Sequence, residues 1–194
     1  MTGYKALAQR KDVDLVDLNS YDSVDLNVPE GIVLTRVRVG RAVTKADVTI
    51  NVPVLKTHKQ TLLSNCLKNW SVGIATREEK KLLHRLGLDE AIVDVYATVT
   101  PSFHLVDAVV AMEGDGPNLP LGKSKPLGLI LAGRNGVAVD AVAATIMGID
   151  IRQVKHLVLA GQRGLGPTEL AEIEIRGERV EEIITPFELP RIEA

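Results

Sequence analysis

Three apolar runs constrain the fold of this chain more than any other feature. Residues Ala46–Leu55, Leu105–Met112 and Leu127–Ala132 are short and rich in Val, Ile, Leu and Ala, which is typical of buried strands. Amphipathic or apolar helical patterns separate them, so helices are expected to cover both faces of the resulting sheet. The sequence therefore predicts an α/β fold, a layered domain with a mostly parallel or mixed sheet flanked by helices.

The remaining patterns complete this prediction. Helical periodicity indicates helices at Tyr4–Arg10, Leu62–Trp70, Arg77–Leu86, Leu88–Val99, Val137–Met147 and Ile151–Ala160. Alternating or β-branched stretches indicate strands at Val13–Leu18, Ile32–Val39, Ile173–Arg176 and Val180–Ile184. No repeat or linker divides the chain, and its 194 residues suit one domain, so residues 1–194 are expected to form a single α/β domain.

Composition excludes several classes of function. A formal net charge of -2 gives no electrostatic basis for binding nucleic acid. No apolar run is long enough to cross a bilayer and no signal peptide opens the sequence, so we expect a cytoplasmic protein without membrane partners. Aromatic residues make up only 3%, so the core must consist mainly of aliphatic side chains.

A single cysteine, Cys66, limits the redox chemistry of the chain. A disulfide within the chain is impossible, and a Cys-ligated iron–sulfur cluster held by one chain is excluded because it needs several thiolates. Leu63, Leu67 and Trp70 surround Cys66 at helical spacing, which favours a small buried apolar residue over a nucleophile.

The first group of candidate site residues follows the run Ala46–Leu55. Lys56 and His58 come directly after it, and Lys68 and Asn69 lie on the polar side of the next helical pattern. Two ammonium groups and a helix N-terminus could bind phosphate or carboxylate, with His58 as an acid–base group or metal ligand. An ordinary amphipathic helix with a solvated face has the same pattern, and spacing does not decide between the two.

The second group is Glu113-Gly114-Asp115-Gly116-Pro117, which follows Leu105–Met112. Carboxylates separated by glycines suit a hard metal ion or a general base, so Glu113 and Asp115 are candidate metal ligands. Gly, Asp and Pro are also the standard residues of a polar turn, and a turn is the favoured reading of these residues alone.

The third group follows Leu127–Ala132. Gly133-Arg134-Asn135-Gly136 could approach a phosphate, and Asp140 falls in the first turn of the next helix. The spacing is neither that of a dinucleotide fingerprint nor that of a Walker loop. Complementation of the helix dipole is the simpler role for Asp140. If the three strands are parallel neighbours, all three groups emerge on one edge of the sheet, and a shared site follows.

The same stretches resemble the domain-of-unknown-function family numbered 362, whose members are often described as iron–sulfur or ferredoxin-associated proteins. The resemblance covers Gly3 to Gly166. It is carried by the motifs Ile50-Asn51-Val52-Pro53-Val54-Leu55-Lys56-Thr57-His58, Lys68-Asn69, Glu113-Gly114-Asp115-Gly116-Pro117 and Val137-Ala138-Val139-Asp140-Ala141. A family histidine matches His84, so the resemblance strengthens the case for His84 and Asp140 as site residues, but it supplies no reaction. The candidate catalytic residues are therefore His58, His84 and Asp140, and the candidate ligand-binding residues are Lys56, Lys68, Asn69 and Gly133.

The chain also departs from the family pattern. Asn135-Gly136 replaces a common Asp-Pro, Ser71 replaces a common aromatic residue, and the Cys clusters of many members are absent. The N-terminal segment of the family has no counterpart here, which implies a fragment or a shortened member. Its loss would leave sheet edge or apolar surface uncovered, so we expect a homo-oligomer or a partner-dependent chain.

Two functions of different classes follow. The first is an enzyme that binds a small anionic substrate and performs redox chemistry with electrons from a separate iron–sulfur protein, as the resemblance implies. The second is a non-catalytic accessory module that docks on such a protein. A cleft with convergent polar groups and perturbed pKa values favours the first, and a flat apolar surface favours the second.

Overall fold

The three apolar runs meet in one five-stranded sheet of the computed structural model, which describes residues 3–20, 22–116 and 121–191. The central strand is β6 (Phe103–Gly114), and β7 (Gly122–Gly133) pairs with one of its edges. The other edge pairs with β3 (Ile50–Asn51) and β4 (Val54–His58), and β5 (Leu62–Ser64) pairs with β4. The predicted α/β class is confirmed.

The sheet is mixed. β3 and β4 run parallel to β6, whereas β5 and β7 are antiparallel to their neighbours. Pro53 separates β3 from β4 because proline has no N–H for the ladder, but its carbonyl still accepts a hydrogen bond from the Asp107 N–H at 2.8 Å. The predicted strand Ala46–Leu55 therefore begins later, is interrupted once, and continues to His58.

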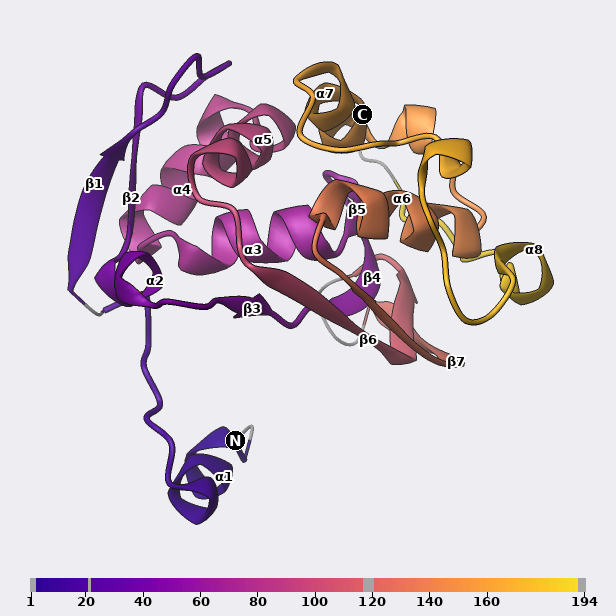
Figure 1. Ribbon diagram of the computed structural model, residues 1–194, viewed down its shortest axis with the longest axis horizontal. Helices are drawn as coiled ribbons and strands as arrows, with labels where there is room; N and C mark the ends of the chain where they lie inside the picture. Colours follow the sequence, from indigo (N-terminus) through magenta and orange to yellow (C-terminus); the bar gives the residue numbers. More distant parts are fainter. Residues whose placement is uncertain (1–2, 21, 117–120, 192–194) are drawn as a thin grey trace.

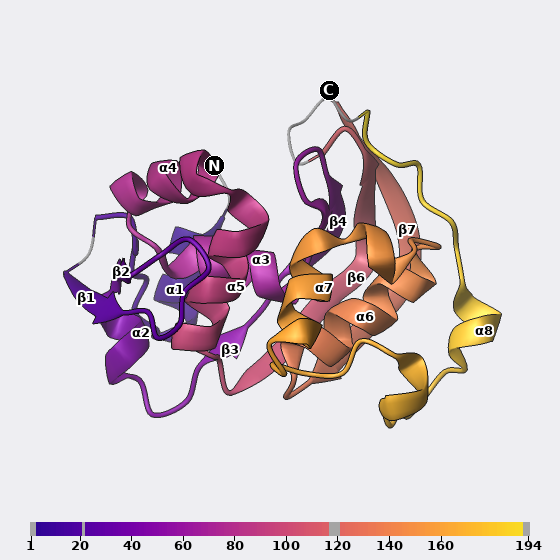
Figure 2. The same cartoon turned by 90° about the horizontal axis from the view of Figure 1, so that it is seen from above.

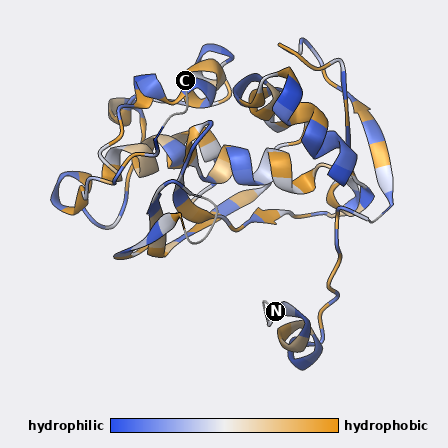
Figure 3. Ribbon diagram, turned by 180° about the vertical axis from the view of Figure 1, so that it is seen from behind, coloured by the Kyte–Doolittle hydropathy of each residue, from blue (hydrophilic) through white to orange (hydrophobic). Residues whose placement is uncertain are grey.

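Helices cover only one face of this sheet. Figure 1 shows α3 (Cys66–Ile74), α5 (Leu88–Thr98) and α6 (Gly136–Ile146) on the same side of it. Alternate residues of β6 follow this asymmetry, since Val106 is fully buried under the helices while Leu105 is exposed. The expectation of helices on both faces is wrong for the described residues, and hydrophobic residues lie open along β3 (Figure 3).

The other elements lie around the sheet and these three helices (Figure 2). They are the helices α1 (Tyr4–Lys11), α2 (Arg41–Lys45), α4 (Arg77–Leu86), α7 (Lys155–Gln162) and α8 (Val180–Ile183), the 3-10 helices η1 (Ile151–Gln153) and η2 (Leu170–Glu172), and the two-stranded sheet of β1 (Ser23–Asn27) and β2 (Arg36–Gly40). Helix α1 stands apart from the rest of the chain at the end of an extended segment (Figure 1).

A buried carboxylate fastens the β1–β2 side to the helical layer. Asp94 of α5 is fully buried and accepts hydrogen bonds from the N–H groups of Ile32 and Val33 at 2.8 Å and of Leu34 at 3.0 Å. Arg163 forms an ion pair with the same carboxylate at 2.8 Å. Because every bond to this buried anion is charge-assisted, Asp94 fixes the segment that precedes β2.

Several predicted strands lack a partner and do not form. Residues 13–17 are extended but unpaired, and the predicted closing strands 173–176 and 180–184 are replaced by irregular chain and α8. By contrast, β1 lies inside a stretch whose Asn, Asp and Pro residues predicted turns. A strand is stabilised by its neighbours, so pairing with β2 overrides the weak local preference of Ser23–Asn27.

Candidate functional site

The β4–β5 hairpin brings the first group of residues together. The helix predicted at Leu62–Trp70 begins at Cys66, and the residues before it form β5, which pairs with β4. Leu62 has a left-handed backbone with φ of 61°, which a branched side chain rarely adopts, so the hairpin turn is held by its surroundings. Figure 2 shows β4 of this hairpin between α4 and β6.

Lys56, His58 and Lys68 form what we call the basic cluster. Burial, followed by the nearby charges of Lys68, His84 and Lys56, lowers the pKa of His58 to about 3. The carboxylate of Asp89, at the start of α5, acts in the opposite direction on both His58 and Lys68. The hairpin, α3 and α4 thus place three basic side chains near His58, and α5 adds the carboxylate of Asp89.

Lys68 is the least compensated charge of the cluster. Its side chain is 8% exposed, and its ammonium forms no hydrogen bond or ion pair with any residue in the described ranges. Burial, and then the charge of Lys56, lower the pKa of Lys68 to about 8. The charge of Lys56 is better compensated, since its ammonium donates a hydrogen bond to the Val54 carbonyl at 3.0 Å. Burial is the cause that lowers the pKa of Lys56.

His58 is a neutral hydrogen-bond donor at pH 7. Its side chain is 7% exposed, and its Nδ1 accepts a hydrogen bond from the Gln60 N–H at 3.2 Å. With a pKa of about 3 the ring carries one proton, and the occupied Nδ1 places that proton on Nε2. His58 can therefore donate a hydrogen bond to an acceptor bound beside Lys68.

A second histidine, His156, was not among the predicted site residues. His156 of α7 is fully buried, and its Nδ1 lies 2.8 Å from a carboxylate oxygen of Asp89, the same residue that acts on Lys68. Its Nε2 is buried without a hydrogen-bond partner in the described part of the chain. Because 67 residues separate Asp89 from His156, no local pattern could have indicated the pair.

Asp140 has a structural place beside this cluster. It is fully buried in α6, and its carboxylate accepts hydrogen bonds from the N–H groups of Cys66 at 2.7 Å and Leu67 at 3.0 Å. Burial raises the pKa of Asp140, and the bonds from Leu67 and Cys66 and the charge of His156 offset part of that rise. Asp140 thus complements the N-terminus of α3, whereas the sequence placed it at the start of its own helix.

Asn69 belongs to a buried hydrogen-bonded chain. Its amide donates to the Asn51 oxygen at 2.7 Å, and the Asn51 amide donates to the Cys66 carbonyl and contacts His104 Nδ1 at 3.1 Å. His104 has a pKa lowered by burial to about 4, so it is neutral and its Nε2–H points to the Tyr96 hydroxyl at 3.2 Å. The Asn69 amide therefore already has a partner in Asn51. Ligand binding by Asn69 stays a prediction.

Glu113 and Asp115 hold the C-terminal segment. The Glu113 carboxylate accepts from the Glu188 N–H at 2.9 Å and pairs with Lys125 at 3.2 Å. The Asp115 carboxylate accepts from the Arg191 N–H at 2.8 Å, while Pro117 lies outside the described residues. Within the described ranges, no three His, Cys, Asp or Glu side chains gather as a metal-binding group. Metal ligation by these two carboxylates stays a prediction.

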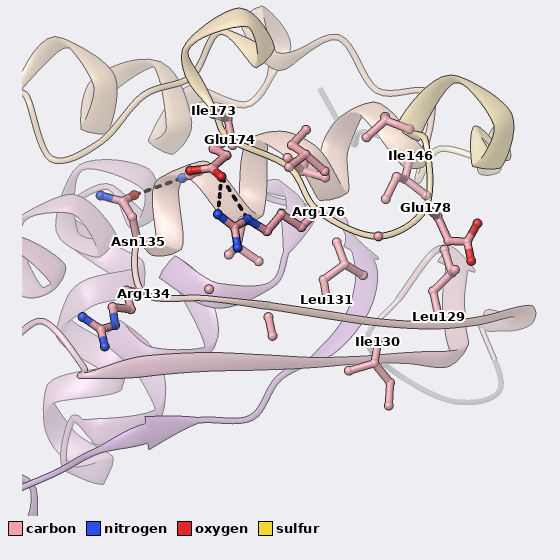
Figure 4. A pocket seen from close by; sticks show the side chains of 18 of the residues that line it. Leu129, Ile130, Leu131, Arg134, Asn135, Ile146, Ile173, Glu174, Arg176 and Glu178 are labelled. Atoms are coloured by element: carbon pink, nitrogen blue, oxygen red, sulfur yellow. Dashed lines mark hydrogen bonds and ion pairs between the residues drawn. The ribbon is translucent and has the colours of Figure 1, made fainter.

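Gly133 lies apart from the basic cluster, in a cavity of about 550 Å³. Figure 4 shows this cavity between β7, α6 and the segment 172–178. Its walls are largely aliphatic, and two charged residues on it, Glu174 and Arg176, bind each other at 2.7 Å. Asn135 caps α6 by accepting from the Ala138 N–H at 3.0 Å, so this glycine turn does not offer that donor to a phosphate.

The predicted shared edge is wrong for the third group. β7 is antiparallel to β6, with Gly133 opposite His104 and Gly122 opposite Gly114. Gly133 therefore leaves the sheet at the amino end of β6, whereas Glu113 lies at its carboxyl end. The loops join one edge only for parallel neighbours, and β7 does not meet that condition.

Comparison with known proteins identifies the family of the chain. The family described as domain of unknown function DUF362 matches residues 1–145. The chain belongs to this family. The match spans Lys56, His58, Lys68 and His84 of the site, whereas His156 lies beyond it.

One curated relative extends further along the chain. Thylakoid-associated protein sll1697 of Synechocystis sp. is 27% identical over 212 residues, which cover 98% of this chain and 62% of the relative. The chain thus spans less than two thirds of that protein. No solved structure matches the chain. Among the described residues, no helix is long and apolar enough to cross a bilayer.

Proposed function

We propose that the basic cluster binds a small anionic ligand bearing a phosphate or carboxylate group. One observation supports this most directly: the Lys68 ammonium is almost fully buried and has no anionic partner in contact among the described residues. A buried ammonium without a counter-ion is costly, and an anion that enters the cluster removes that cost. Lys56 adds a second positive charge and His58 adds an N–H donor.

The side chains, and not the helix end, would bind the anion. The first two N–H groups of α3 already donate to Asp140, so a ligand cannot use them. This arrangement differs from the usual phosphate site at a helix N-terminus. It predicts selectivity for a compact anion that reaches Lys68 and His58 together.

An enzymatic role would add an acid–base group to this anion site. The buried Nε2 of His156 has no hydrogen-bond partner among the described residues while Asp89 holds Nδ1, the arrangement in which a carboxylate orients a histidine for proton transfer. We therefore propose His156 as the proton-transfer group for an anion bound at Lys68, in addition to the predicted His58 and His84. Redox chemistry with an iron–sulfur partner and a cytoplasmic location stay predictions.

Replacing Lys68 tests the proposal. Lys68→Met is expected to weaken binding of inorganic phosphate at least tenfold, because hydrogen bonds between charged groups contribute about 1.5–3 kcal/mol. Isothermal titration calorimetry measures this change, with acetate as the carboxylate probe. Lys45→Met, on the exposed end of α2, removes the same charge and should leave binding unchanged. Equal losses in both variants would show that only net charge matters.

The same variant should gain stability. A lysine pKa near 8 instead of 10.5 means that burial disfavours the charged form, at about 1.4 kcal/mol for each pH unit. Lys68→Met is therefore expected to raise the free energy of unfolding at pH 7 by about 1–3 kcal/mol. Urea denaturation measures it. A loss of stability together with a loss of binding would contradict a ligand-binding role for Lys68.

Anion binding should also depend on pH through Lys68. The ammonium is present below its pKa of about 8 and is lost as the pH rises through that value. We expect the affinity for acetate, whose charge is constant over this range, to fall between pH 7 and pH 9. An affinity that stays level up to pH 10 would assign binding to a lysine with an ordinary pKa.

A further inference from the structure

The bare face of the sheet is an extended apolar surface. Its large side chains come from the four strands β3, β4, β6 and β7 and from the link between β3 and β4, and 39–66% of each is exposed. They are Ile50, Val52, Val54, Leu105, Val109 and Ile130. A contiguous apolar patch of this kind on a globular protein usually marks an interface.

One carboxylate lies in the middle of this face. The register of the sheet places Asp107 between Val54 on β4 and Ile130 on β7. Asp107 is exposed, and among the described residues its carboxylate accepts a hydrogen bond from the Val109 N–H at 3.0 Å and forms no ion pair. A partner that covers the face is therefore expected to be apolar and to bring a positive charge.

The N-terminal arm, residues 3–17, has both properties. Tyr4, Leu7, Val13, Leu15 and Val16 are 40–63% exposed on it. Its helix α1 contains Lys5, Arg10 and Lys11 and no acidic residue. The arm thus leaves its own apolar side chains exposed to water. This exposure is unfavourable in free energy, as it is for the apolar residues of the bare face.

The base of the arm is tied to the β1–β2 side of the molecule. The Leu18 side chain lies against Gly40, and Lys80 donates to the Asn19 side chain at 2.7 Å. From this anchor the arm extends away from the body, and Figure 1 shows it on the side of the sheet that the helices leave bare. It does not return over its own sheet.

We propose that two copies of this chain form a dimer in which the arm of each copy covers the bare sheet face of the other. Each chain carries both complementary surfaces, so one two-fold axis satisfies both arms and both faces. The apolar side chains of the arm cover the six apolar residues of the face, and a basic residue of α1 pairs with Asp107. Exchange of a tethered element between identical chains is a common route to dimers.

Light scattering coupled to size-exclusion chromatography tests the dimer. The unchanged chain should have the mass of two copies at micromolar concentration. The double variant Val52→Asp and Ile130→Asp should have the mass of one, because it places carboxylates on the bare face. Ile184→Asp changes an apolar residue of similar exposure outside both surfaces and should remain a dimer. A monomeric unchanged chain overturns the proposal.

Cross-linking separates arm exchange from other dimers without disturbing the fold. Chains with Leu7→Cys and chains with Val52→Cys, of different mass, are mixed and treated with a short bismaleimide. Both positions are exposed, and the native Cys66 is fully buried. Cross-links between unlike chains are expected to dominate. Cross-links mainly between like chains would mean that arms meet arms and sheets meet sheets, which overturns arm exchange. Neither outcome depends on anion binding.

Discussion

Asp140→Ala is expected to lower the free energy of unfolding by about 3–5 kcal/mol, because it removes two charge-assisted hydrogen bonds worth about 1.5–3 kcal/mol each. The N–H groups of Cys66 and Leu67 would lose their acceptor at a site without solvent access. A cavity between α3 and α6 adds to the loss. Urea denaturation at pH 7 measures the change.

Asp140→Asn provides the control. The amide has nearly the same shape and keeps one oxygen as an acceptor, so about half of the loss should remain. If the asparagine variant is as unstable as the alanine variant, the negative charge at the start of α3 matters more than the number of acceptors. If neither variant is destabilised, the capping role of Asp140 is wrong.

Acidification should destabilise the protein well before its carboxylates titrate. Burial lowers the pKa of His58 to about 3 and that of His104 to about 4, whereas an unfolded histidine titrates near 6.5. Between these values the unfolded chain binds more protons, so stability falls as the pH falls below 6.5. After allowance for solvent screening, we expect a loss of about 2–4 kcal/mol between pH 7.5 and pH 5.

Single substitutions assign this pH dependence. His58→Gln keeps a polar side chain that does not titrate, so the loss between pH 7.5 and pH 5 should shrink by about half. Lys45→Gln, at an exposed position of α2, should leave the slope unchanged. Denaturant titrations at several pH values measure the slopes. Identical slopes for His58→Gln and the unchanged chain would show that His58 is accessible to protons in the folded state.

The class of fold could be predicted from the sequence because periodicity reports burial directly. Continuous apolar runs indicated β6 and β7, and the helices α4, α5 and α6 lie within a few residues of their predicted bounds. The direction of β7 could not be predicted, because an apolar strand has the same composition in a parallel and an antiparallel pair. The direction of β7 decides whether Gly133 lies at the same edge of the sheet as the other site residues.

The site was predicted in part for a similar reason. Lys56, His58 and Lys68 are close in sequence, and the short hairpin between them keeps them close in space. Asp89 and His156 meet only through the packing of α5 and α7, so nothing local distinguishes either from a surface residue. Asp140 was expected to complement the dipole of its own helix, but the N–H groups from which it accepts lie 73 and 74 residues away, so spacing could not indicate them.

The basic cluster draws its members from separate parts of the fold, and this has a thermodynamic consequence. An anion held by Lys68 and His58, with Asp89 and His156 beside them, would join α3, the hairpin, α5 and α7 through one bound group. An anion bound to residues of several elements stabilises each of these elements against local opening. Amide hydrogen exchange in these elements would then slow together when the anion binds, so that occupancy of the site can be followed from the backbone alone.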